Sequence, residues 1–154
     1  DVFVSYQLEP EENDELRYDV AIGSTSFSNL VSQYYENNTT LLDKINHYGA
    51  QAVFLAFPYN NISAEHRKTV LDFRYALEDR IEKEILDTDG LGLLLGGAMG
   101  TCCCYMDFLL YDVKGFMEKV LPVLREYPQY SFYLSDFRQH CQLIKLTDAE
   151  MEGC

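Results

Sequence analysis

The order in which two hydrophobic periodicities follow each other is the feature that most constrains the fold of this chain. From residue 51 onward, apolar stretches of strand length are interrupted twice by longer stretches with a helical period. The resulting order is strand, helix, strand, strand, helix, strand. This order is typical of a split β-α-β arrangement, in which two helices cover one face of an antiparallel sheet. We therefore predict an α+β fold.

Four strands and two helices make up this order. The strands are predicted at 52–57, 91–97, 102–111 and 130–134. The first helix is predicted over 64–86, with Ser63 as its N-terminal cap, and the second begins after Asp112, which can cap it. Residues 140–146 favour one more strand.

The first fifty residues favour a smaller, β-rich unit. Residues 2–8 and 16–22 are rich in strand formers and flank an acidic stretch, which indicates a hairpin with an acidic loop. Residues 39–48 have helical spacing and end at Gly49. We predict an acidic segment at 1–49 packed on a main domain at 50–146, with a tail at 147–154.

The main domain is thus predicted to be ferredoxin-like (βαββαβ), with an N-terminal β-hairpin and a short helix added to it. The residues Leu77-Glu78-Asp79, the run from Gly96 to Thr101, and Tyr105-Met106-Asp107-Phe108 strengthen this prediction. The segment that contains them resembles an uncharacterised ferredoxin-like family related to the regulator of ribonuclease E activity. The resemblance covers about the last hundred residues and implies an acidic, non-catalytic, protein-binding module. No binding residue of that family can be matched to a position in this sequence.

The charge of the chain excludes one class of partner. It holds 12 basic and 25 acidic residues, for a net charge of -13, and such a polyanion repels phosphate backbones. Nucleic acid is therefore not an expected partner. Residues 1–50 hold 9 of the acidic and 2 of the basic residues, so the first third is the more acidic by density and suits a basic protein partner.

Cysteine usage and hydropathy bear on the compartment. The five cysteines include the consecutive Cys102, Cys103 and Cys104 and do not form a disulfide framework, which favours a reduced, cytoplasmic setting. The sequence contains no run of 18 apolar residues and no basic-apolar leader, so no membrane association is expected. The start at Asp1 instead of Met leaves open whether a leader has been removed.

No motif with a chemical mechanism stands out. The glycines from 90 to 100 lack the third glycine of a dinucleotide fingerprint, because position 95 is Leu95, and no paired metal ligands are present. A nucleophilic Cys103 with Asp107 and His140 would require a positive neighbourhood that nothing in the sequence places there. We predict no catalytic residue, no metal and no cofactor.

Aromatic residues offer the best candidate surface. On the predicted strand 102–111, one face carries Tyr105, Asp107 and Tyr111, and Tyr133 of the last strand is expected on the same side of the sheet. Together with Arg138, these residues are the predicted binding site for a protein partner, because aromatic residues are enriched in interface cores.

Three alternatives stay open for this face. Residues 1–50 can fold over it and bury it, or it can mediate a homodimer. The third alternative is a small-ligand site or an enzyme, with a cleft between the N-terminal segment and the sheet that brings together Tyr105, Asp107, Tyr133 and Arg138.

Overall fold

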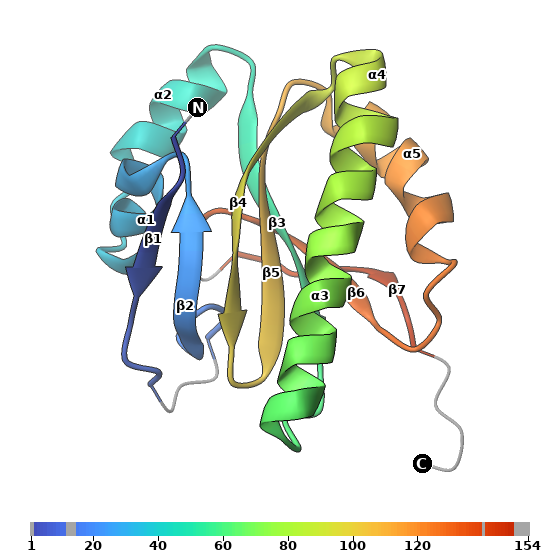
Figure 1. Ribbon diagram of the computed structural model, residues 1–154. Coiled ribbons are helices and arrows are strands. Elements are labelled where there is room, and N and C mark those ends of the chain that lie inside the picture. Colours follow the sequence, from blue (N-terminus) through green and yellow to red (C-terminus); the bar gives the residue numbers. More distant parts are fainter. Residues whose placement is uncertain (1, 12–14, 140, 150–154) are drawn as a thin grey trace.

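The computed structural model describes residues 2–11, 15–139 and 141–149 and has an α+β architecture (Figure 1). The strands are β1 (Val4–Gln7), β2 (Val20–Thr25), β3 (Gln51–Pro58), β4 (Gly92–Gly100), β5 (Cys103–Leu110), β6 (Phe132–Asp136) and β7 (Ile144–Thr147). The helices are α1 (Ser28–Tyr35), α2 (Thr40–His47), α3 (Ala64–Ile81), the short α4 (Asp87–Asp89) and α5 (Val113–Leu124). A π-helical turn, Glu82–Leu86, joins α3 to α4.

All of these strands belong to one open sheet, in the order β1-β2-β4-β5-β3-β6-β7. Every neighbouring pair is antiparallel. The hairpin β1–β2 therefore extends the sheet beyond β4, and β7 extends it beyond β6. The two edges of the sheet are formed by β1 and β7.

Helices cover both faces of the central strands, so the protein has three layers (Figure 1). Alternate residues of β3, such as Leu55 and Phe57, point to a core that they share with α3 and α5. The residues between them, such as Phe54, point to a second core that is completed by α1 and α2. Because successive side chains of a strand face opposite sides, a strand buried on both faces is apolar throughout, as residues 52–57 are.

Most predicted elements from residue 51 onward are present. Ser63 and Asp112 cap α3 and α5 by accepting hydrogen bonds from the backbone N–H groups of His66 and Gly115. The last predicted strand begins later than expected, as β7, and His140 lies outside the described residues. The predicted helix 64–86 changes to π-helical geometry after Ile81.

The N-terminal residues differ more from the prediction. The strand expected over 16–22 begins only at Val20, because residues 16–19 form a turn in which Arg17 has a φ of 73°. Helix α1 falls in a polar stretch for which no element was predicted. Together with α2 it covers the sheet face opposite α3 and α5, so the N-terminal segment contributes both strands and a helical layer.

Candidate functional site

Arg17 is the centre of a buried polar cluster between the N-terminal turn and β5. Its side chain has no exposed surface, and its backbone lies in the left-handed region, which is uncommon for a residue with a side chain. Two tyrosines hold this conformation. The Arg17 N–H donates to the Tyr105 hydroxyl at 3.0 Å, and the Tyr35 hydroxyl donates to the Arg17 carbonyl at 2.7 Å.

The guanidinium of Arg17 forms a two-pronged ion pair with Asp107. Nη1 and Nη2 donate to Oδ1 and Oδ2 at 2.5 and 3.1 Å, and Nη2 also donates to the Tyr6 hydroxyl at 3.3 Å. Aromatic rings surround the cation, with ring centroids 4.7 to 5.8 Å from its central carbon. These are the rings of Tyr34, Phe54, Tyr105 and Phe137.

The neighbouring carboxylate favours the charged form of Arg17. Burial on its own lowers the pKa of Arg17, but the Asp107 carboxylate, together with Tyr6 and Tyr35, raises it, so the pKa of Arg17 lies well above its ordinary value. A buried charge without a partner is costly, whereas a paired and hydrogen-bonded one is tolerated. Arg17 and Asp107 therefore tie the N-terminal turn to the central sheet, and each neutralises the other.

Asp19 extends the cluster toward the turn between β4 and β5. Its Oδ1 accepts a hydrogen bond from the Tyr105 hydroxyl, and its Oδ2 accepts the N–H groups of Cys102 and Cys103 at 2.9 Å each. Burial raises the pKa of Cys103 to about 12, with a further contribution from Asp19, and burial raises that of Cys104 to about 12. These two thiols are protonated at neutral pH, which is the reverse of what a nucleophilic cysteine requires.

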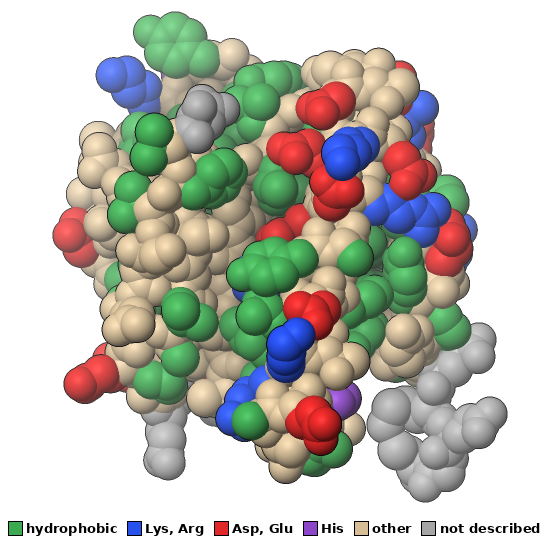
Figure 2. Space-filling model, viewed as in Figure 1, with side chains coloured by type: hydrophobic (Ala, Val, Ile, Leu, Met, Phe, Trp, Pro, Cys, Tyr) green, Lys and Arg blue, Asp and Glu red, His purple; other side chains and the backbone are tan. Residues whose placement is uncertain are grey.

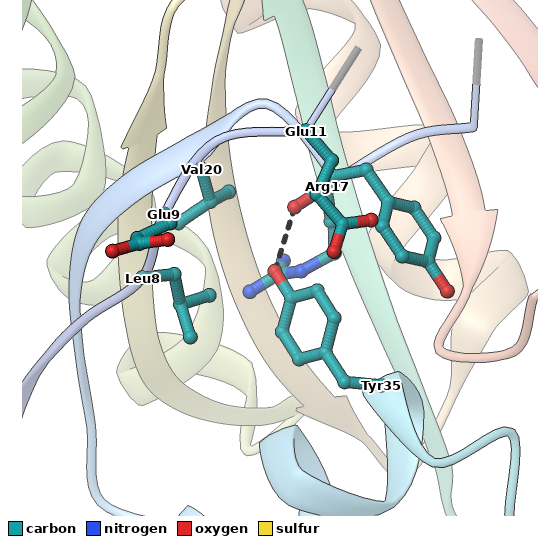
Figure 3. A pocket seen from close by; sticks show the side chains of 7 residues that line it. Leu8, Glu9, Glu11, Arg17, Val20 and Tyr35 are labelled. Carbon is teal, nitrogen blue, oxygen red and sulfur yellow. Dashed lines mark hydrogen bonds between the residues drawn. The ribbon is translucent and has the colours of Figure 1, made fainter. Parts of the chain in front are cut away.

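An acidic hollow opens above Arg17 (Figure 3). It has a volume of about 300 Å³. Its outer wall carries Glu9 and Glu11, which follow β1, and the ring of Tyr35 from α1 forms the opposite wall. The residues that line this acidic hollow are Leu8, Glu9, Glu11, Arg17, Tyr18, Val20 and Tyr35.

A second, more apolar hollow lies between β1 and α1. Its volume is about 340 Å³, and it shares Leu8 and Tyr35 with the acidic hollow. The residues that line this apolar hollow are Val4, Tyr6, Leu8, Thr25, Ser28, Val31, Ser32, Tyr35 and Glu36. The two hollows therefore lie end to end along β1, on the sheet face that α1 and α2 cover.

Strand β1 itself is an open edge of the sheet. The Leu8 N–H donates to the Ala21 carbonyl, and the register is regular, so by alternation the backbone groups of Ser5 and Gln7 point away from β2. The strand contains no charged residue, and Phe3 and Val4 are about half exposed, at 49% and 51%. On the other sheet face, apolar side chains also gather beside α3 (Figure 2).

The residues of the predicted site do not form one surface. Tyr105 and Asp107 lie together, as expected, but they are 1% exposed because Arg17, α1 and α2 cover them. Tyr133 pairs with Ala56, which also pairs with Tyr105, so both tyrosines lie on the same face of the sheet but are separated by a strand. The prediction of an exposed surface at Tyr105 and Asp107 is therefore wrong.

The other two predicted residues lie elsewhere. Tyr111 is 52% exposed just beyond the end of β5. Arg138 follows β6 and forms ion pairs with Asp136 and with Asp43 of α2, each at 3.0 Å. A cleft that joins all the predicted residues does not exist among the described residues, since Arg17 fills the space at Asp107.

Sequence reasoning missed Arg17, Tyr35 and the hollows beside them. One signal was present: Arg17 is the only basic residue among the first forty-three, and it follows a dense acidic stretch. Its ion-pair partner Asp107 was predicted on the strand face that also carries Tyr105 and Tyr111. Because buried charges are usually paired, the isolated Arg17 and the inward-facing Asp107 could have been predicted from the sequence to form an ion pair.

Comparisons with protein-family models, curated proteins and solved structures found no match. Within the described ranges, no group of three or more histidine, cysteine or acidic side chains could hold a metal ion. No helix in the same part of the chain is long and apolar enough to cross a membrane.

Proposed function

We propose that this chain is a non-catalytic, protein-binding module that adds an extended, basic segment of its partner to β1. The observation that carries the proposal is the unguarded edge. Proteins usually protect an edge strand with lysine, proline, a bulge or extreme shortness. Strand β1 is short, at four residues, as β7 is, but it has no charged residue, no proline and no break in its register with β2, and the outward backbone groups of Ser5 and Gln7 can pair with an added strand.

The opposite edge of the sheet, β7, has two of the protective features that β1 lacks, a lysine and an irregular register. Strand β7 contains Lys145, which forms an ion pair with Asp148 at 2.9 Å, and its pairing with β6 is irregular. Both features discourage the addition of a further strand. The contrast between the two edges favours β1 as the binding edge.

Charge determines which kind of segment fits. The acidic residues Glu9, Glu11 and Glu36 border the hollows along β1, and the cation of Arg17 is neutralised by Asp107. A basic segment is attracted to this edge, whereas a second copy of the chain would bring another net charge of -13 to it. We therefore favour a basic partner over a homodimer.

The competing proposal of a small-ligand site or an enzyme has less support. It relied on Tyr105 and Asp107 facing an open cleft, but Asp107 is engaged by Arg17 and the Tyr105 hydroxyl by Asp19. The acidic hollow is large enough for a small molecule, yet its described polar side chains do not converge on a reacting group.

We further propose that the unit from β3 to β6 is a ferredoxin-like domain of the family named above. What supports this is the order β4-β5-β3-β6 in the middle of the sheet, with α3 and α5 both packed on one of its faces. The relation to the regulator family agrees with a role in binding, but it rests on the sequence resemblance alone.

Binding of a threonine-rich peptide that carries one valine and one lysine two positions apart tests the proposed function. Gln7→Pro removes one outward-pointing N–H without removing a β1–β2 hydrogen bond, and Gln7→Ala is the matched control that keeps the N–H. We expect Gln7→Pro to weaken binding at least about tenfold, which corresponds to about 1.4 kcal/mol, and Gln7→Ala to leave it unchanged. Equal binding by both folded variants would contradict strand addition at β1.

A further inference from the structure

The acidic and apolar hollows lie on one face of the sheet and share a wall. Val4, Tyr6 and Leu8 alternate along the chain and line the apolar hollow, and Leu8 then separates it from the acidic hollow. A strand added to β1 would run along both hollows, about 4.8 Å beyond β1. Alternate side chains of that strand would point toward them.

The apolar hollow suits an aliphatic side chain. Its walls include the aliphatic Val4, the buried Val31 of α1 and the ring of Tyr35. Filling a space of this kind removes apolar surface from water, which favours binding. The charged residue Glu36 stands at its rim and is exposed.

The acidic hollow suits a lysine or arginine side chain. Glu9 and Glu11 are both exposed at its outer wall, where a cation can reach them. The methylene stem of such a side chain can pack on Leu8 and on the ring of Tyr35, in the manner of long basic side chains that cover apolar surface. Arg17 below does not oppose a cation, since Asp107 compensates its charge.

We propose that the partner segment carries an aliphatic residue and a basic residue separated by an even number of positions, two or four, which enter the apolar and the acidic hollow respectively. This inference rests on the proposed function and specifies its ligand. Evenness follows from strand geometry, because side chains of one strand share a face only at even spacing. With odd spacing, one of the two would point to the opposite face, beside Phe3 and Ile22.

The test uses four peptides of identical composition, each with one leucine and one lysine in a threonine and glutamine host. The spacings between leucine and lysine are two, three, four and five. Titration calorimetry measures binding to the full chain. We expect the better even-spaced peptide to bind at least about tenfold tighter than either odd-spaced one, and the preference to disappear in Gln7→Pro.

Two variants assign the hollows. The double variant Glu9→Gln, Glu11→Gln should lose the preference for lysine over glutamine in the even-spaced peptide. Its matched control, Glu65→Gln with Glu118→Gln, removes two exposed charges elsewhere and should keep that preference. Ser32→Trp fills the apolar hollow from its exposed wall and should abolish the preference for leucine over threonine.

The outcomes separate the inference from the proposed function. Equal binding of even-spaced and odd-spaced peptides, together with a loss in Gln7→Pro, would overturn the spacing rule and leave strand addition at β1 intact. Binding that Gln7→Pro does not affect would overturn both. An equal loss of the lysine preference in the two glutamine double variants would show a long-range effect of charge and overturn the assignment of the acidic hollow.

Discussion

The ion pair between Arg74 and Glu78 on α3 predicts a specific dependence of stability on pH. Both residues are buried, at 3% and 8% exposure, and they lie against the backbone of β4 at Gly97, where a Cβ atom would collide with the Glu78 carboxylate. Arg74 Nε and Glu78 Oε2 are 3.5 Å apart, and neither atom has a hydrogen-bond partner among the described residues. The carboxylate is therefore poorly compensated for its burial.

Burial raises the pKa of Glu78 to about 7 from an ordinary value of 4.5, although the charge of Arg74 lowers it. Asp107, which approaches from the other face of the sheet, and Glu82 both raise it further. Between pH 4.5 and 7 the folded chain thus holds a proton that the unfolded chain has lost. The free energy of unfolding falls as the pH rises through this interval, by up to ~3 kcal/mol at about 1.4 kcal/mol per pH unit.

Glu78→Gln removes this titration, because the amide is neutral at every pH. We expect the variant to equal the wild type near pH 4.5 and to exceed it by ~1–3 kcal/mol in free energy of unfolding at pH 8. Urea unfolding at several pH values measures the difference between the two proteins, which cancels the titration of all other groups. Glu118→Gln, at an exposed position on α5, is the control for the loss of one negative charge.

A difference for Glu78→Gln that stays constant from pH 4.5 to 8 would refute the reasoning, and so would a variant that becomes less stable than the wild type as the pH rises. The first result would mean that the pKa of Glu78 does not change on folding. The second would mean that the ion pair with Arg74 outweighs the burial of the carboxylate.

Two further predictions concern the cluster at Arg17. Asp107→Asn leaves a buried guanidinium without its counter-charge, so it should lower the free energy of unfolding by ~3–5 kcal/mol, as measured by urea unfolding. The double variant Asp107→Asn, Arg17→Met removes the unpaired charge as well and should recover part of that loss. Recovery of none of it would argue against the ion pair as the cause. Tyr105→Phe removes the hydroxyl that joins the Arg17 N–H to Asp19, so we expect a loss of ~1–3 kcal/mol in the same assay; a change below about 0.5 kcal/mol, typical of surface positions, would show that the hydroxyl is dispensable.

Local periodicity was sufficient to predict the central strands and helices. The alternation from residue 102 to 111 puts Cys102, Cys104, Met106, Phe108 and Leu110 on one face, which we expect to be core. The structure buries Cys104, Met106, Phe108 and Leu110 in one core, whereas Cys102 lies before β5 and is exposed. Such assignments succeed because the side-chain period of a strand depends on backbone geometry alone. The pattern also placed Tyr105 on the same side of the sheet as Tyr133, which the pairing of both with Ala56 confirms.

What covers a face depends on contacts between distant segments, and the periodicity of one strand contains no information about them. Helix α1 was missed because only three of its eight residues are buried, namely Leu30, Val31 and Tyr34, and the rest of its sequence is polar. Its stability comes from packing on the sheet, which short helices require. Burial of the tyrosine face by residues 1–50 was consequently only one of the alternatives that the sequence left open, and the structure shows that α1 and α2 bury it.

The pairing of Arg17 changes what the charge count means for function. The first forty-three residues contain one basic residue, Arg17. If Arg17 were exposed, its positive charge would weaken the negative electrostatic potential along β1. In the structure Arg17 has no exposed surface, and its charge is compensated by Asp107, which lies ninety positions away in the sequence. The exposed charges on the walls of the two hollows are therefore all acidic, at Glu9, Glu11 and Glu36. A buried pair thus leaves a more uniformly negative edge than the sequence indicates, and this is why a basic segment is the partner that fits it.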